Sequence, residues 1–134
     1  MMVNMIPIGE KVQDMTAMDM AKTLNVSKGT VRNRLIGLYK ENVILGYNAR
    51  VRYKMLGMDE AIVGFEIAPE FYTKALAAIK ALEFVKEVYR TSGDHSAMAR
   101  VVSDADEIDK HIESLEGIEG IKKVYPSFIQ EIIK

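Results

Sequence analysis

The chain contains no cysteine, and this absence excludes disulfide frameworks, zinc sites built from thiolates and cysteine nucleophiles. It also lacks an apolar run of about 18 residues, the length that crosses a bilayer as a helix. Its first residues, MMVNMIPIGEK, have no basic flank, long apolar stretch or small-residue cleavage site of an export signal. From these absences we expect a cytoplasmic protein without a membrane partner.

The motifs of common enzyme classes are also missing. There is no phosphate-binding loop, no dinucleotide fingerprint and no evident nucleophile paired with a base. His95 and His111 have no third ligand placed beside them by the sequence, and the acids near His111 follow the spacing of a solvated face. We therefore expect no catalytic residue, no metal site and no cofactor.

What is present is a division of charge along the chain. With 49% hydrophobic residues, 134 residues can bury one good core or two small ones. Residues 1–58 hold nine lysines and arginines against four acids, a formal charge of +5, whereas residues 59–134 carry −6. A basic part joined to an acidic part predicts two tasks, with a polyanion as the partner of the first.

The basic part has the signals of two short helices. Thr16 and Asp19 have the spacing of a capping box, which predicts that a helix starts there. Three apolar residues then fall on one side of it: Met20, Ala21 and Leu24. Asn25 tolerates the left-handed conformation that stops a helix and turns the chain sharply.

A second helix is predicted to start at Ser27, a good N-cap residue. Its apolar stripe has the spacing i, i+4 and i+7: Val31, Leu35 and Leu38. At 100° per residue, roughly the turn of an α-helix, the opposite side carries Gly29, Arg32, Asn33, Ile36 and Lys40. Two helices joined by such a short turn resemble a helix-turn-helix.

This second helix is the candidate DNA-binding element. Its first turn and free N–H groups favour a phosphate, while a guanidinium suits guanine and an amide suits adenine. Gly29 and Gly37 weaken the helix, which makes sense if DNA must come close. The candidate contacts are Ser27, Lys28, Thr30, Arg32, Asn33 and Arg34. The alternative is that these cations form an ordinary solvated helix face.

The acidic part has the order of a βαββαβ domain, the ferredoxin-like plan, so the predicted fold class is α+β. Strands are expected over residues 61–68, 85–92, 96–103 and 121–133, with a helix over 71–82. Ser103 and Asp106 have capping-box spacing and predict a second helix, which Gly117 would close. Its inward residues are Ile108, Ile112 and Leu115. Pro126 argues that the last strand lies at a sheet edge.

The chain resembles the Lrp/AsnC, or feast/famine, transcriptional regulators over residues 15–134. Three stretches carry the resemblance: MAKTLNVSKGTVRNRL, ENVILGYNARVRYKMLG and EVYRTSGDHSAMARVVS. It implies a helix-turn-helix domain over residues 1–45, a linker over 46–60 and a ferredoxin-like domain over 61–134. It further implies a homodimer that assembles into octamers, double-stranded operator DNA as partner and a small amino-acid effector bound between dimers.

Carried over by position, the effector loop comprises Thr91, Ser92, Gly93, Asp94, His95 and Ser96. Backbone N–H groups of Gly93 and Asp94 could hold a carboxylate, and the Asp94 side chain an amino group. The chain departs from the family pattern at Ser96, where an aspartate is usual.

The start of the chain also departs from the family pattern, in which a full helix precedes the helix-turn-helix. Pro7 and Gly9 would break such a helix, so we expect it to be short, displaced or missing, with apolar surface uncovered. Two hypotheses follow. The first is an effector-modulated DNA-binding regulator, and the second is a metabolite-binding oligomerisation module with a degenerate DNA-binding domain.

Overall fold

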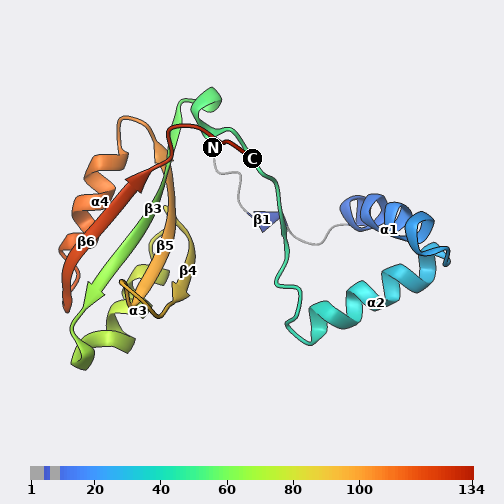
Figure 1. Cartoon of the computed structure of the whole chain (residues 1–134), viewed down its shortest axis with the longest axis horizontal. Coiled ribbons are helices and arrows are strands. Elements are labelled where there is room, and N and C mark those ends of the chain that lie inside the picture. Colours follow the sequence, from blue (N-terminus) through green and yellow to red (C-terminus); the bar gives the residue numbers. More distant parts are fainter. Residues whose placement is uncertain (1–4, 7–9) are drawn as a thin grey trace. The chain divides into compact units, whose positions relative to one another are not determined.

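The computed structural model describes residues 5–6 and 10–134, with side chains from residue 17 onward (Figure 1). The chain forms two compact units, Met1–Val51 and Arg52–Lys134. Tyr47–Asn48, within the predicted linker, form strand β2, which pairs antiparallel with β1 (Met5–Ile6). The fold class is α+β, as the sequence predicts.

The first unit contains two helices, α1 (Glu10–Leu24) and α2 (Lys28–Lys40). Asn25 has a φ of 54°, which confirms its left-handed turn between the helices. Ser27 caps α2 as predicted, because its Oγ accepts a hydrogen bond of 3.1 Å from the Thr30 N–H. Among the side chains described from residue 17 onward, the buried cluster of this unit consists of Ala17, Val31 and Leu35, with Ala21 and Ile44 packed against it.

Two predictions for this unit are wrong. Helix α1 begins at Glu10, so Thr16 lies inside the helix and is not its cap. Leu38 was expected in the apolar stripe of α2 that packs inward, but it is 37% exposed. Met20 and Leu24, which share one side of α1 with Ala21, are also exposed. Periodicity marks an apolar face, but two helices alone bury only the part of that face that lies between them.

Before Glu10 the structure describes Met5–Ile6, which form a strand. The expectation that Pro7 and Gly9 break a leading helix falls on residues outside the described ones. Among the side chains described from residue 17 onward, many large apolar ones of this unit are exposed. The exposed large residues are Met18, Met20, Leu24, Val26, Leu38, Tyr39, Val43 and Leu45.

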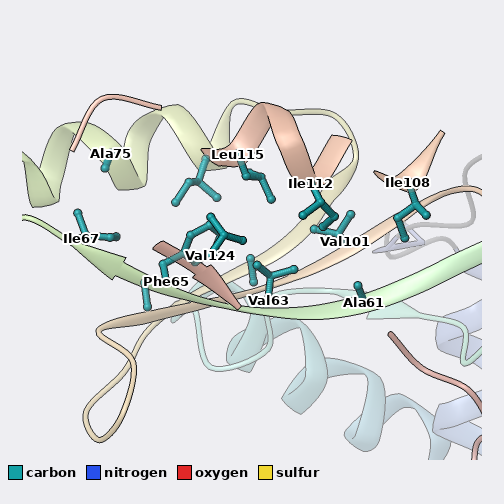
Figure 2. Close-up of a cluster of buried hydrophobic side chains, with 13 residues drawn as sticks. Ala61, Val63, Phe65, Ile67, Ala75, Val101, Ile108, Ile112, Leu115 and Val124 are labelled. Atoms are coloured by element: carbon teal, nitrogen blue, oxygen red, sulfur yellow. The ribbon is translucent and has the colours of Figure 1, made fainter. Parts of the chain in front are cut away.

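The second unit has the ferredoxin-like βαββαβ order. Its elements are β3 (Met58–Ile67), α3 (Tyr72–Lys80), β4 (Val85–Arg90), β5 (Ala97–Asp104), α4 (Ile108–Glu116) and β6 (Ile121–Phe128). Short 3₁₀ helices lie at Tyr53–Leu56 and Pro69–Phe71. The four strands are antiparallel in the order β4-β5-β3-β6. Helices α3 and α4 lie on the same side of the sheet, where Ala75 of α3 and Leu115 of α4 belong to one buried cluster (Figure 2).

The core of this unit fills the space between the sheet and its two helices (Figure 2). Alternate residues of β3, including Val63 and Phe65, point toward the helices and are fully buried. Their partners from the helices include Ile79 and Leu115, also fully buried. The period of two in β3 therefore leaves the other set of its side chains on the opposite, helix-free face, which we call the open face.

The predicted inward positions of α4 are confirmed, but its predicted cap is wrong. Ile108, Ile112 and Leu115 are all buried. The helix starts at Ile108 after Glu107, which makes no side-chain cap bond. Ser103 instead lies in β5, so the capping-box spacing with Asp106 is a coincidence of sequence.

The last strand is shorter than predicted, because β6 ends at Phe128. It does lie at an edge of the sheet, as Pro126 indicates.

Gly120 offers a test of this architecture. It has a φ of +92°, and a Cβ placed there would lie 2.2 Å from Cβ of Phe71. We expect Gly120→Ala to lower the free energy of unfolding by about 3 kcal/mol, through backbone strain and overpacking. Urea unfolding followed by circular dichroism measures this change.

Gly117→Ala is the matched control, because its Cβ would meet only the Ser114 carbonyl oxygen, at 3.6 Å. It should change the unfolding free energy by less than about 0.5 kcal/mol. Equal unfolding midpoints for the two variants would contradict the packing described here.

Candidate DNA-binding and effector sites

The N-terminus of α2 has a charge and a set of N–H groups that favour an anion. Ser27 Oγ shares a second hydrogen bond, of 2.8 Å, with the Thr30 hydroxyl, so the cap is held firmly. The first turn contains Lys28 and no acidic side chain. The remaining N–H groups of this turn and the positive end of the helix dipole favour a phosphate at this position.

The predicted DNA-contacting side chains lie on one helix with different exposure. Ser27, Lys28, Asn33 and Arg34 are exposed, whereas Thr30 and Arg32 are partly buried. A Cβ added at Gly29 or Gly37 would meet no atom within 4 Å. Packing within the protein therefore does not require either glycine, and a duplex backbone could approach α2 at both positions.

The predicted effector loop, residues 91–96, connects β4 to β5 and has a defined conformation. The Thr91 N–H donates to the Ser96 carbonyl oxygen over 3.1 Å, and the Thr91 hydroxyl donates to the His95 carbonyl oxygen over 2.7 Å. Gly93 has a φ of 112°, which a residue with a side chain rarely adopts. The tip of the loop, residues 92–94, is exposed.

Ser96 fastens the end of this loop to the middle of the sheet. Its N–H donates to the Phe65 carbonyl oxygen over 3.3 Å, and its own carbonyl oxygen accepts a hydrogen bond of 2.5 Å from the Tyr72 hydroxyl. The guanidinium of Arg90 lies 5.0 Å from the centre of the Tyr72 ring. The Ser96 hydroxyl also donates to the Phe65 carbonyl oxygen, over 3.4 Å, so both the backbone and the side chain of Ser96 hold the loop to β3.

His95 lies against Gly64 and Tyr125, two residues that the sequence analysis did not single out. Its ring is 4.8 Å from that of Tyr125, and a Cβ at Gly64 would lie 2.6 Å from the imidazole. An isolated glycine inside a strand is a known sign of close approach. That sign could have identified Gly64, but not the side chain that approaches it.

Arg100 on β5 is a cation with a structural task. Its Nε donates to Glu87 of β4 over 2.6 Å and its Nη1 to Glu60 of β3 over 3.1 Å. Burial by itself would lower the Arg100 pKa, but its hydrogen bonds with Glu87, Tyr53 and Glu60 and the charge of Glu87 outweigh burial and raise the pKa. The guanidinium thus joins three strands across the open face and stays charged.

Ser103 and His111 form a hydroxyl–imidazole pair that the sequence did not reveal. Ser103 Oγ lies 2.8 Å from His111 Nδ1, and the His111 ring stacks on Phe84 with centres 4.2 Å apart. Ser103 is only 5% exposed. Because a substrate could not reach this hydroxyl, the pair is a packing contact between β5 and α4 and not a catalytic dyad.

Within the described part of the chain, no three histidine or acidic side chains lie close enough together to hold a metal ion. In the same part, none of the helices has both the length and the apolar character needed to span a bilayer.

Residues 60–134 match the family described as the Lrp/AsnC ligand binding domain. The HTH-type transcriptional regulator LrpA1 of Halobacterium salinarum is 38% identical over 117 residues, which cover 85% of this chain and 82% of that protein. The HTH-type transcriptional regulator LrpA of Pyrococcus horikoshii is 35% identical over 119 residues, covering 87% and 84%.

A solved structure of AsnC from Escherichia coli resembles this chain with a TM-score of 0.65 at 23% identity, covering 88% of this chain and 82% of that one. At that identity the likeness supports the fold alone. The family match extends over more than half of the chain, and the two archaeal relatives cover most of it. The chain therefore belongs to the Lrp/AsnC family.

Proposed function

We propose that this chain is a helix-turn-helix transcriptional regulator that binds operator DNA through α2 and is modulated by a small amino acid. The observation that carries the proposal is a capped α2 with exposed cations and two sterically open glycines, in a chain of the Lrp/AsnC family. In this proposal residues 1–45 form the DNA-binding domain, 46–60 the linker and 61–134 the effector domain.

The contacts on α2 divide into two kinds. Ser27, Lys28 and Thr30 with the first-turn N–H groups hold a phosphate, and Arg34 holds another. Arg32 and Asn33 read base edges in the major groove, where guanidinium matches guanine and amide matches adenine. The phosphate contacts set the position of the helix, and the base contacts set the sequence that is preferred.

A homodimer presents two such helices to a palindromic operator, with half-sites about one helical turn or a multiple of it apart. The open face supports self-association, since it carries the large exposed side chains of Ile62, Tyr89 and Tyr125 next to the Arg100 cluster. Dimers assemble further, up to octamers, with the amino acid bound at loop 91–96 between them.

The alternative, a metabolite-binding module whose DNA-binding domain has degenerated, is less favoured. Its support is the strand Met5–Ile6, the presence of Pro7 and Gly9 in the sequence before Glu10, and the exposed apolar side chains of the first unit. Against it, α2 keeps its cap, its sharp entry turn and its cations. The two hypotheses differ in whether phosphate contacts are made, and this is measurable.

Arg34→Ala and Arg32→Ala should separate phosphate contacts from base contacts. For wild type, the logarithm of affinity should fall linearly with log salt, with a slope near −0.9 per phosphate neutralised. Arg34→Ala should make that slope shallower by about 0.9. Arg32→Ala should cost about 1–3 kcal/mol on operator DNA and much less on random DNA. Fluorescence anisotropy with DNA from upstream of its own gene measures both.

Lys80→Ala, which removes an exposed charge of the second unit, is the matched control and should leave the slope unchanged. If both arginine variants bind like wild type, α2 is not the DNA-binding element. A wild-type affinity that does not respond to salt would favour the degenerate-domain alternative.

Gly29→Ala should stabilise the protein and weaken DNA binding together. The new methyl group meets no protein atom within 4 Å. Alanine in place of glycine should raise helix stability by about 0.5–1 kcal/mol. The same methyl should reduce operator affinity if the duplex lies close to position 29. Thermal unfolding and anisotropy report the two effects separately, and a variant that is more stable yet binds DNA as well as wild type would exclude close approach there.

Asp94→Asn should weaken amino-acid binding and the assembly it controls. The change removes the charge that pairs with the effector's amino group, which we expect to reduce affinity by about 1.5–3 kcal/mol. Calorimetry with a panel of amino acids, followed by light scattering with and without the tightest one, measures binding and assembly. Asp109→Asn on α4 is the control. Equal affinity of wild type and Asp94→Asn would remove Asp94 from the site.

A further inference from the structure

The middle of strand β3 has a gap on the open face where Gly64 stands. A Cβ placed at Gly64 would lie 2.6, 2.7 and 2.9 Å from the Cδ2, Cγ and Nε2 atoms of His95. Three ring atoms at such similar distances mean that the imidazole lies over the glycine. No side chain larger than hydrogen fits at this position while the ring is in place.

Tyr125 forms the second wall of this slot. It is the register partner of Gly64 on the neighbouring strand β6, and its ring is tilted by 41° to the His95 ring. Tyr125 is itself held from two sides, because the Lys123 ammonium lies 4.9 Å from its ring centre and its hydroxyl contacts Glu66 at 3.5 Å. The slot is therefore built by backbone and side chains of β3 and β6, not by the loop.

The His95 ring and the Ser96 backbone contact two adjacent residues of β3, Gly64 and Phe65. Ser96 N–H bonds the carbonyl oxygen of Phe65, the residue after Gly64. On the other side of the turn, the Thr91 hydroxyl bonds the His95 carbonyl oxygen. The exposed tip at residues 92–94 therefore projects from a base that is fastened to the sheet at two consecutive positions.

The contact uses the ring as a flat body and not as a polar group. His95 Nδ1 is buried, and no hydrogen-bond partner for it lies within the described chain. A hydrogen bond to Nδ1 is therefore not what holds the ring, and the slot selects a flat ring that fits over Gly64 and against the tilted ring of Tyr125. An aromatic residue of similar thickness without a buried polar atom should serve at least as well.

We propose that His95 is the positioning residue of the effector loop: its ring, seated between Gly64 and Tyr125, fixes the conformation in which residues 92–94 meet the amino acid. This inference rests on the proposed effector function of the loop. His95 touches the loop's support and not the effector, so its effect on binding is indirect and depends on ring shape.

The first test needs no effector and uses the full chain. Native-state hydrogen exchange of the Thr91 and Ser96 amides, both of which are hydrogen-bonded, reports whether the loop stays seated. His95→Ala should speed exchange at these two amides by more than about tenfold, while His95→Phe should stay within about threefold of wild type. The amide of Val102, which bonds the Phe84 carbonyl oxygen, is the internal control and should not change.

A steric double-mutant cycle tests the slot itself. Gly64→Ala should expel the ring and speed exchange at Thr91 and Ser96 as His95→Ala does. The double variant Gly64→Ala with His95→Ala should be no worse than His95→Ala alone, because the colliding ring has gone. Additive effects of the two changes would overturn the slot. If Gly64→Ala alone does not fold, the double variant should restore folding, which again reports the collision.

The second test measures affinity for whichever amino acid of the panel binds wild type. His95→Ala should lose at least about tenfold in affinity, His95→Phe should retain it, and Ser127→Ala, an exposed change on β6, should have no effect. Should His95→Phe lose affinity as His95→Ala does, or should His95→Ala leave exchange unchanged, the positioning role is wrong. If no amino acid binds wild type, the proposed effector function fails, and the exchange result still decides the seating of the loop.

Discussion

The second unit depends on the register of strand β3 with its two neighbours. Strand β3 is hydrogen-bonded to β5 on one side and to β6 on the other, so its register with both is fixed. With a period of two, Val63 and Phe65 then fill the core while Gly64 faces the other way. A slip by one residue would exchange the two sets and destroy both the core and the slot for His95. The same register that buries the core therefore positions the candidate effector loop through Gly64 and Phe65.

The open face combines two stabilising devices with different chemistry. Around Arg100, two carboxylates from neighbouring strands surround one guanidinium, all three being partly buried. Near Gly64, the rings of His95 and Tyr125 pack in the space that the glycine leaves, without a hydrogen bond to the buried Nδ1 of His95. Removing one charged side chain of the ion cluster would leave the others partly buried without their partner. The aromatic contact should instead tolerate any ring of suitable shape.

Local signals in the sequence were enough for the fold and for parts of the candidate sites. The cap at Ser27, the turn at Asn25 and the inward positions of α4 depend on neighbours within a few residues, and all were predictable. Spacing alone misled where other contacts decided the outcome. Ser103 matches a capping box but bonds His111, and Leu38 matches the stripe of α2 but stays 37% exposed. Contacts such as His95 on Gly64 join residues 31 positions apart, which no periodicity encodes.

The modest core of the first unit has a consequence for how the protein would operate. Among the side chains described from residue 17 onward, its buried apolar residues are Ala17, Val31 and Leu35, while many larger side chains of the unit remain in contact with water. A unit that buries few apolar side chains has a small free energy of unfolding. A ligand that binds only the folded form adds its binding free energy to that stability. Occupancy of a duplex and integrity of the two-helix unit are then thermodynamically linked. Dilution or competitor nucleic acid would loosen this unit first, while the sheet domain stays intact.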